Sequence, residues 1–186
     1  LAQQLTLRVG ARLDQRSSDT QRELLREARL TGCLQHPNIV PVYDLGLDAD
    51  GAPLLVMKRI EGTVWGEELY RPRPEGASCP AGEELERHLD ILMQVCNAMS
   101  FAHSQGVLHR DLKPDNVMVG HFGEVYVLDW GVALHLNEAA RAHGMRPGVA
   151  GTPAYMAPEM ISGSLEGLDE RTDVYLLGGL LHTILT

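Results

Sequence analysis

The chain has 186 residues, 44% of them hydrophobic and 22% charged, which is typical of a globular protein with one or two modest cores. Its net charge of −9 argues against a general affinity for nucleic acid or for an anionic membrane. The three cysteines are widely spaced and the eight histidines lack metal-binding spacing, so we expect no zinc site and a reduced, cytoplasmic location. No apolar stretch is long enough to cross a bilayer, so we expect no membrane segment within the chain, while a tether beyond its ends stays open.

The first sixty residues predict a β-rich region with one helix. Apolar and polar residues alternate over residues 5–9, which predicts a short strand. Leucines at helical spacing predict a helix over residues 22–30. Two further strands are predicted at residues 39–45 and 53–60, joined by a turn at residues 48–51.

The pattern becomes mostly helical after residue 61. Prolines exclude regular structure from residues 71–76, which we expect to form a loop. A long amphipathic helix is predicted over residues 83–104. Two short apolar runs, at residues 117–119 and 125–128, predict a hairpin. A last helix is expected to start near Asp173.

Three short blocks contain polar side chains suited to phosphoryl transfer. Residues 109–116 read His-Arg-Asp-Leu-Lys-Pro-Asp-Asn, residues 129–131 read Asp-Trp-Gly, and residues 151–159 read Gly-Thr-Pro-Ala-Tyr-Met-Ala-Pro-Glu. In this order and spacing the blocks resemble the catalytic loop, metal loop and P+1 loop of protein kinases. Trp130 stands where that family usually has phenylalanine.

The resemblance implies an α+β, bilobal protein-kinase-like fold. A partial, β-rich N-lobe would occupy residues 1–61 and a partial, helical C-lobe residues 62–186. In wording, the blocks look like those of bacterial receptor-like Ser/Thr protein kinases. No Gly-rich phosphate loop precedes Leu5, and no further C-lobe helices follow the last predicted helix, so we expect a fragment or a degenerate kinase.

The resemblance assigns catalytic and metal-binding roles to four side chains. Asp111 would accept or orient the proton of the acceptor hydroxyl, and Lys113 would place a positive charge beside the transferring phosphoryl group. Asn116, in the same loop, and Asp129 would hold Mg²⁺, which prefers hard oxygen ligands. Taken singly, Asp111 could be a loop cap, Lys113 a surface lysine, and the other two ordinary turn residues.

The resemblance also implies an ATP pocket. Met57 would lie behind the adenine ring, the backbone of Lys58 and Ile60 would hydrogen-bond its edge, and Met118 would form its floor. For the two methionines, the alternative is an ordinary place in the hydrophobic core.

One phosphate contact departs from the family pattern. Glu27 would pair with a strand lysine that touches the α- and β-phosphates, and Arg8 occupies that strand position. A guanidinium is larger and planar, so it does not replace an ammonium at a tight site. The alternative is that Arg8 is an ordinary strand residue. No lysine precedes Lys58, so no shifted alignment supplies one.

Further expectations concern the segments around the catalytic loop. Thr152 resembles a residue of the loop that selects Ser or Thr acceptors. Asp173 resembles a buried aspartate that ties the last helix to the catalytic loop, although a helix N-cap is the alternative. Glu159 is expected to lack its usual arginine partner. Residues 132–150 contain no Ser, Thr or Tyr, so we expect no phosphate partner for Arg110 there.

Together these features imply a Ser/Thr protein kinase domain that transfers the γ-phosphoryl group of ATP, with Mg²⁺, to protein hydroxyls. A nucleotide and a protein substrate with a Ser or Thr acceptor are the expected partners, and nucleic acid is not. The alternative is a pseudokinase, a nucleotide- or partner-binding module without efficient catalysis. Arg8 and the missing Gly-rich loop favour that alternative, whereas the intact set of polar transfer residues favours the kinase.

Overall fold

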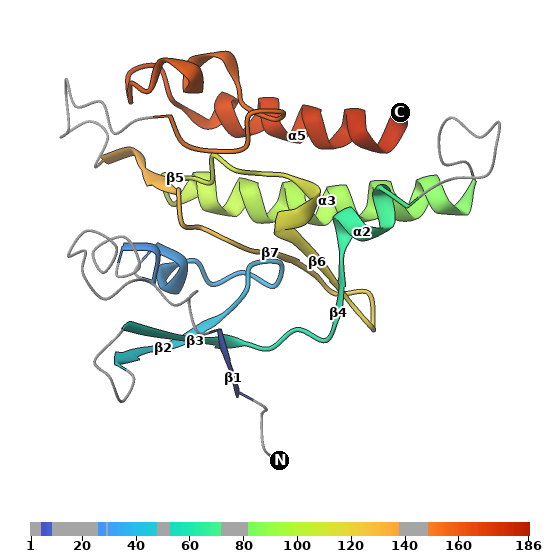
Figure 1. Cartoon of the computed structure of the whole chain (residues 1–186), viewed down its shortest axis with the longest axis horizontal. Coiled ribbons are helices and arrows are strands. Elements are labelled where there is room, and N and C mark those ends of the chain that lie inside the picture. Colours follow the sequence, from blue (N-terminus) through green and yellow to red (C-terminus); the bar gives the residue numbers. More distant parts are fainter. Residues whose placement is uncertain (1–4, 9–25, 29, 48–52, 72–81, 138–148) are drawn as a thin grey trace.

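The computed structural model describes the following residues: 5–8, 26–28, 30–47, 53–71, 82–137 and 149–186. Figure 1 shows a three-stranded sheet at one end of the molecule and two long helices at the other. None of the helices in these ranges is long and apolar enough to span a membrane.

The first sheet has the order β1-β3-β2 and is antiparallel throughout. Its strands are β1 (Leu5–Arg8), β2 (Val42–Leu47) and β3 (Pro53–Lys58). The prediction that the second strand starts at residue 39 is wrong. Pro41 has no N–H to donate to a ladder, and Ile39 instead forms a parallel bridge with Val127. The predicted turn at residues 48–51 lies outside the described residues.

A helical segment at residues 26–28 and 30–33 contains Glu27. Most of the helix predicted over residues 22–30 precedes this segment, outside the described residues. The chain leaves the helix before Asn38, which attaches the segment to the other half of the molecule. The Asn38 side chain donates to the carbonyl oxygen of Val125 at 3.0 Å, and its own carbonyl accepts from the N–H of Val127 at 2.8 Å.

The second sheet has the order β4-β6-β7 and contains the predicted hairpin. Its strands are β4 (Gly62–Val64), β6 (Val117–Gly120) and β7 (Val125–Val127). Met118 lies in the middle of this sheet, opposite Val64 on one side and Tyr126 on the other. Strand β3 of the first sheet ends at Lys58, two residues before its predicted end, because the chain there crosses to β4 of the second sheet.

Two long helices and several short elements form the rest. The helix α3 (Glu83–Ser104) has the predicted bounds, and α5 (Glu170–Leu185) begins three residues before the predicted start. The short helix α2 (Trp65–Leu69) was not predicted. The remaining elements are β5 (Val107–Leu108), η1 (Pro114–Asn116), β8 (Leu134–His135) and η2 (Pro158–Ser162).

The hydrophobic core lies between α3, α5 and the loop that joins β5 to β6. Large side chains from all three parts are fully buried there, among them Met99, Leu108, Leu112, Leu176, Leu180 and Ile184. Leu112 is the neighbour of Asp111 in the sequence. Its burial therefore anchors the candidate catalytic loop in the core, while the side chains on either side of it are partly exposed.

Candidate active site

The side chain of Asp173 anchors the backbone of the catalytic loop. Its side chain is fully buried, and its two carboxylate oxygens accept from the backbone N–H of His109 at 2.8 Å and of Arg110 at 2.9 Å. His103 contacts the same carboxylate at 2.8 Å. The N-cap alternative for Asp173 is wrong, because Asp169 caps α5 by accepting from the N–H of Arg171 at 2.9 Å. The carboxylate of Asp173 instead fixes α5 to the loop.

His109 is a core histidine that joins the catalytic and metal loops. Its ring is buried, and burial lowers its pKa, so the ring is neutral at pH 7. Nε2 donates to the carbonyl oxygen of Leu128 at 3.0 Å, and Nδ1 accepts from the N–H of Asp111 at 3.2 Å. The ring also lies 4.6 Å from that of Trp130. Both hydrogen bonds suit a single neutral tautomer.

Strained backbone marks both loops. Arg110 has a φ of 66° and Asp129 a φ of 58°, and no other non-glycine residue in the described part of the chain has a positive φ. Such conformations persist only where the surroundings enforce them, and they cluster at functional sites. The Arg110 guanidinium donates to the carbonyl oxygen of Val132 at 2.7 Å, so its partner here is a backbone carbonyl. Burial lowers the pKa of Arg110 to about 10, which leaves it charged at neutral pH.

The structure brings four polar side chains together above the core. The hydroxyl of Thr152 donates to Asp111 Oδ1 at 2.7 Å and accepts from the Lys113 ammonium at 2.7 Å. Lys113 Nζ lies 3.2 Å from Asp111 Oδ2. The Asn116 amide donates to the same Oδ2 at 3.0 Å. The Thr152 hydroxyl therefore lies between the Asp111 carboxylate and the Lys113 ammonium. Asn116 orients that carboxylate through its other oxygen.

Asn116 and Asp129 offer oxygen ligands that fit Mg²⁺. The Asn116 amide nitrogen is used by Asp111, so its carbonyl oxygen Oδ1 is the group left to face a cation. A backbone hydrogen bond of 2.8 Å from the N–H of Leu128 to the carbonyl of Asn116 holds the two loops side by side. The Asp129 carboxylate is exposed. One carboxylate and one amide oxygen suit a cation that keeps several waters and binds phosphates.

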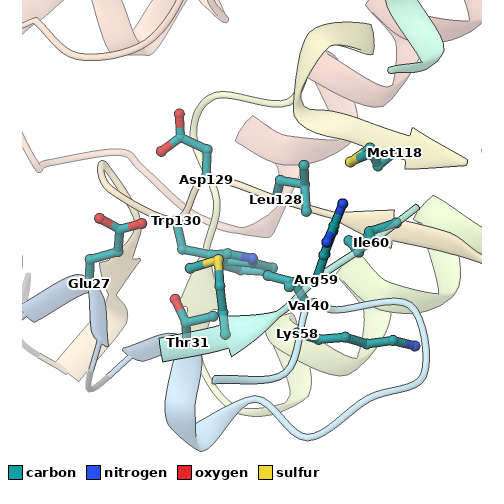
Figure 2. A pocket seen from close by; sticks show the side chains of 11 residues that line it. Glu27, Thr31, Val40, Lys58, Arg59, Ile60, Met118, Leu128, Asp129 and Trp130 are labelled. Carbon is teal, nitrogen blue, oxygen red and sulfur yellow. The ribbon is translucent and has the colours of Figure 1, made fainter. Parts of the chain in front are cut away.

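A pocket of about 340 Å³ adjoins these groups, within the usual range for a small-molecule site. Figure 2 shows its lining side chains. They come from the helical segment, both sheets and the metal loop: Glu27, Thr31, Val40, Met57, Lys58, Arg59, Ile60, Met118, Leu128, Asp129 and Trp130. Met57 is the unlabelled side chain in that view. All the residues predicted for the nucleotide pocket line it except Arg8, whose side chain lies outside the described part.

Glu27 and Asp129 approach each other across Gly131. A Cβ atom added to Gly131 would lie 3.2 Å from Asp129 Oδ1 and 3.5 Å from Glu27 Oε2. The helical segment therefore brings the Glu27 carboxylate to the metal loop. Thr31 and Val40 also line the pocket but were not predicted. Thr31 lies one helical turn after Glu27, and this spacing could have pointed to it.

The P+1 segment has a partner in α5 that was not predicted from the sequence. Glu159 was expected to lack its usual arginine partner, and the hydroxyl of Thr172 donates to its Oε1 at 2.7 Å. Thr172 is fully buried and precedes Asp173 at the start of α5. The same turn of α5 therefore holds both the catalytic loop and the P+1 segment.

The fold and this constellation define a protein kinase domain. The chain belongs to this family, because the family described as "Protein kinase domain" matches residues 10–186. The expected family and the α+β, kinase-like fold class are thereby confirmed. The division into lobes at residue 61 and the roles of single site residues stay predictions.

The chain is similar to bacterial proteins named serine/threonine-protein kinase PknD. It is 36% identical to that of Chlamydia muridarum over 193 residues, covering 89% of this chain and 20% of the relative. It is 38% identical to that of Chlamydia trachomatis serovar D over 192 residues, covering 87% and 20%. For Protochlamydia amoebophila, identity is 34% over 184 residues, covering 89% and 18%. The chain thus spans about a fifth of the length of these relatives.

Proposed function

We propose that this chain is the catalytic domain of a Ser/Thr protein kinase, which transfers the γ-phosphoryl group of ATP to Ser or Thr hydroxyls of a protein. The observation that carries the proposal is the Thr152 hydroxyl, held between Asp111 and Lys113. This arrangement supports the proposal, because the Thr152 hydroxyl donates its proton to a carboxylate while its oxygen accepts from an ammonium. The names of the bacterial relatives support the same activity over the pseudokinase alternative.

In the proposed mechanism, one side chain handles the proton of the acceptor hydroxyl and another handles the charge of the phosphoryl group. Asp111 orients the acceptor hydroxyl and accepts its proton as the oxygen attacks the γ-phosphorus. The bond from that phosphorus to the β–γ bridging oxygen breaks, and ADP leaves. Lys113 stabilises the negative charge of the transferring group. Positioning and electrostatics of this kind account for most of the catalysis in phosphoryl transfer.

The chain offers groups that would bind both the adenine of ATP and the metal ion. The backbone of Lys58 and Ile60 would bind the adenine edge, between Met57 and Met118. Asn116 and Asp129 would hold Mg²⁺, which supplies charge neutralisation for the phosphates when bound. The pocket and the two oxygen ligands meet at Asp129, which belongs to both. ATP with Mg²⁺ is therefore the cofactor set that these residues fit.

The first test concerns the acceptor. The full-length protein, given labelled ATP, Mg²⁺ and a generic basic protein substrate, should place phosphate on Ser and Thr. Tyrosine should receive almost none, because Lys113 and Thr152 resemble the residues found at these positions in Ser/Thr kinases. Phospho-amino-acid analysis of the substrate is the measurement. Predominant phosphotyrosine would contradict the assignment.

A second prediction concerns Arg8. Its backbone lies in β1 opposite Leu55 of β3, next to the strand that supplies Met57. If Arg8 stands at the phosphate-contact position, Arg8→Lys should restore a point-like cation and raise phosphoryl transfer in the full-length protein. One well-placed electrostatic contact is commonly worth ~10²–10³ in rate, and we expect a gain of about tenfold because arginine already supplies the positive charge. The measurement is the steady-state turnover of the wild type and of Arg8→Lys. A loss of activity in Arg8→Lys would mean that arginine is the functional residue or that the position is wrongly assigned.

A further inference from the structure

The side chain of Lys58 does not point at the candidate catalytic groups. In Figure 2 it runs away from Glu27 and Asp129 along the end of β3. Its ammonium donates to the hydroxyl of Tyr126 and lies 4.5 Å from the centre of the Tyr126 ring. The chain has only one other lysine, Lys113, and that lysine belongs to the candidate catalytic group.

The contact joins two sheets at the edge of the pocket. Lys58 is the last residue of β3, and its backbone N–H donates to the carbonyl of Pro41 at 2.9 Å. Tyr126 is only 6% exposed and lies in the middle of β7, directly opposite Met118. Lys58 therefore connects the segment predicted to bind the adenine edge with the neighbour of the predicted adenine floor.

The surroundings keep Lys58 charged. Its hydrogen bond to Tyr126 is the main cause that raises its pKa, and the negative charge of Glu124 acts in the same direction, while burial opposes them. Glu124 is itself held in the β6–β7 turn, where its carboxylate accepts from the N–H of Phe122 at 3.1 Å. An ammonium over an aromatic face is a directional contact, and a neutral side chain of the same length cannot replace it.

We propose that Lys58 is a positioning residue for the nucleotide. Through Tyr126 it fixes the end of β3 against the β6–β7 hairpin, and so sets the spacing between Met57 and Met118, the adenine slot of the proposed ATP pocket. The inference rests on the proposed nucleotide site and adds a residue that acts through its side chain, apart from its backbone. The contact should lower the cost of ordering the slot when nucleotide binds. It should leave the transfer step unchanged, because the Asp111 side chain is held by Asn116 and Thr152, and that of Lys113 by Thr152.

The test measures binding and turnover separately. In the full-length protein, Lys58→Met should weaken binding of fluorescent mant-ADP with Mg²⁺ by about five- to tenfold, the size of one lost cation–aromatic and hydrogen-bond contact. KM for ATP should rise by the same factor while kcat changes less than twofold. Tyr126→Phe keeps the ring and should give a smaller loss, of about threefold. The double variant should be no weaker than Lys58→Met, because both changes remove one contact. Lys58→Arg should recover most of the affinity.

The controls separate this role from general stability and from the proposed function. Arg171→Met removes a cation whose side chain is 89% exposed and should leave mant-ADP affinity unchanged. Circular dichroism at the assay temperature verifies that each variant is folded. Folded Lys58→Met and Tyr126→Phe proteins with wild-type affinity would overturn the positioning role and leave the kinase proposal intact. A wild type that binds mant-ADP but transfers no phosphate would overturn the kinase proposal alone. A folded wild type that binds no nucleotide would overturn both.

Discussion

Asp111→Asn should reduce phosphoryl transfer by about 10³-fold, the loss expected when a positioned general base is removed. The amide cannot accept the proton of the attacking hydroxyl, but it preserves the size of the side chain and can still meet Asn116. Nucleotide affinity should therefore change by less than about threefold, because Asp111 does not line the pocket. Turnover with labelled ATP and mant-ADP binding, measured on the same preparations of the full-length protein, give the two numbers.

Asp115→Asn provides the matched control. Asp115 lies four residues further along the same loop, and its side chain is exposed. The substitution changes charge and size in the same way but removes no group assigned to the transfer. It should keep turnover within about threefold of wild type, the scale of a surface change. Equal losses in both variants would indicate a general electrostatic effect and contradict the role of Asp111.

Asp173→Ala should have the largest effect on stability. It leaves the backbone N–H groups of His109 and Arg110 buried without their acceptor and removes the partner of His103. Loss of a buried, multiply bonded carboxylate costs about 3–5 kcal/mol. The catalytic loop should lose its fixed geometry together with this energy. The expected readouts are a lower denaturation midpoint and faster amide exchange in the peptide that contains residues 109–116.

A neighbouring aspartate on the same helix is the comparison for this loss. Asp169→Ala removes the side-chain cap of α5, at a surface position, and should cost about 1 kcal/mol. Amide exchange in the catalytic loop should stay at the wild-type rate. If Asp173→Ala were no more destabilising than Asp169→Ala, the carboxylate of Asp173 would not hold the loop.

The sequence predicted the elements whose signal is local. The long helix α3 has the expected bounds because its apolar residues repeat at helical spacing over its whole length. The β6–β7 hairpin follows from two apolar runs separated by a short polar turn. The candidate site was equally accessible, because Asp111, Lys113 and Asn116 lie within one continuous motif. The fold then needs only to bring Asp129 and Thr152 to them.

Contacts between distant segments were not predictable in this way. The start of β2 was misplaced because Ile39 pairs with Val127, a partner nearly ninety positions away. The contact between Lys58 and Tyr126 has no local pattern either, since each residue looks ordinary in its own strand. Thr172 was missed as the partner of Glu159 because only the fold brings the start of α5 to the P+1 segment. Propensity and periodicity contain no information on such pairs.

The most direct test of the central claim is a single-turnover experiment with the full-length protein, ATP and Mg²⁺. The protein is mixed with γ-labelled ATP and a substrate containing Ser and Thr, and labelled protein is counted against time. We expect Mg²⁺-dependent label on the substrate, at a rate that falls by about 10³-fold in Asp111→Asn. Wild-type protein that binds ATP but transfers no label, at any Mg²⁺ concentration, would contradict it and establish the pseudokinase alternative.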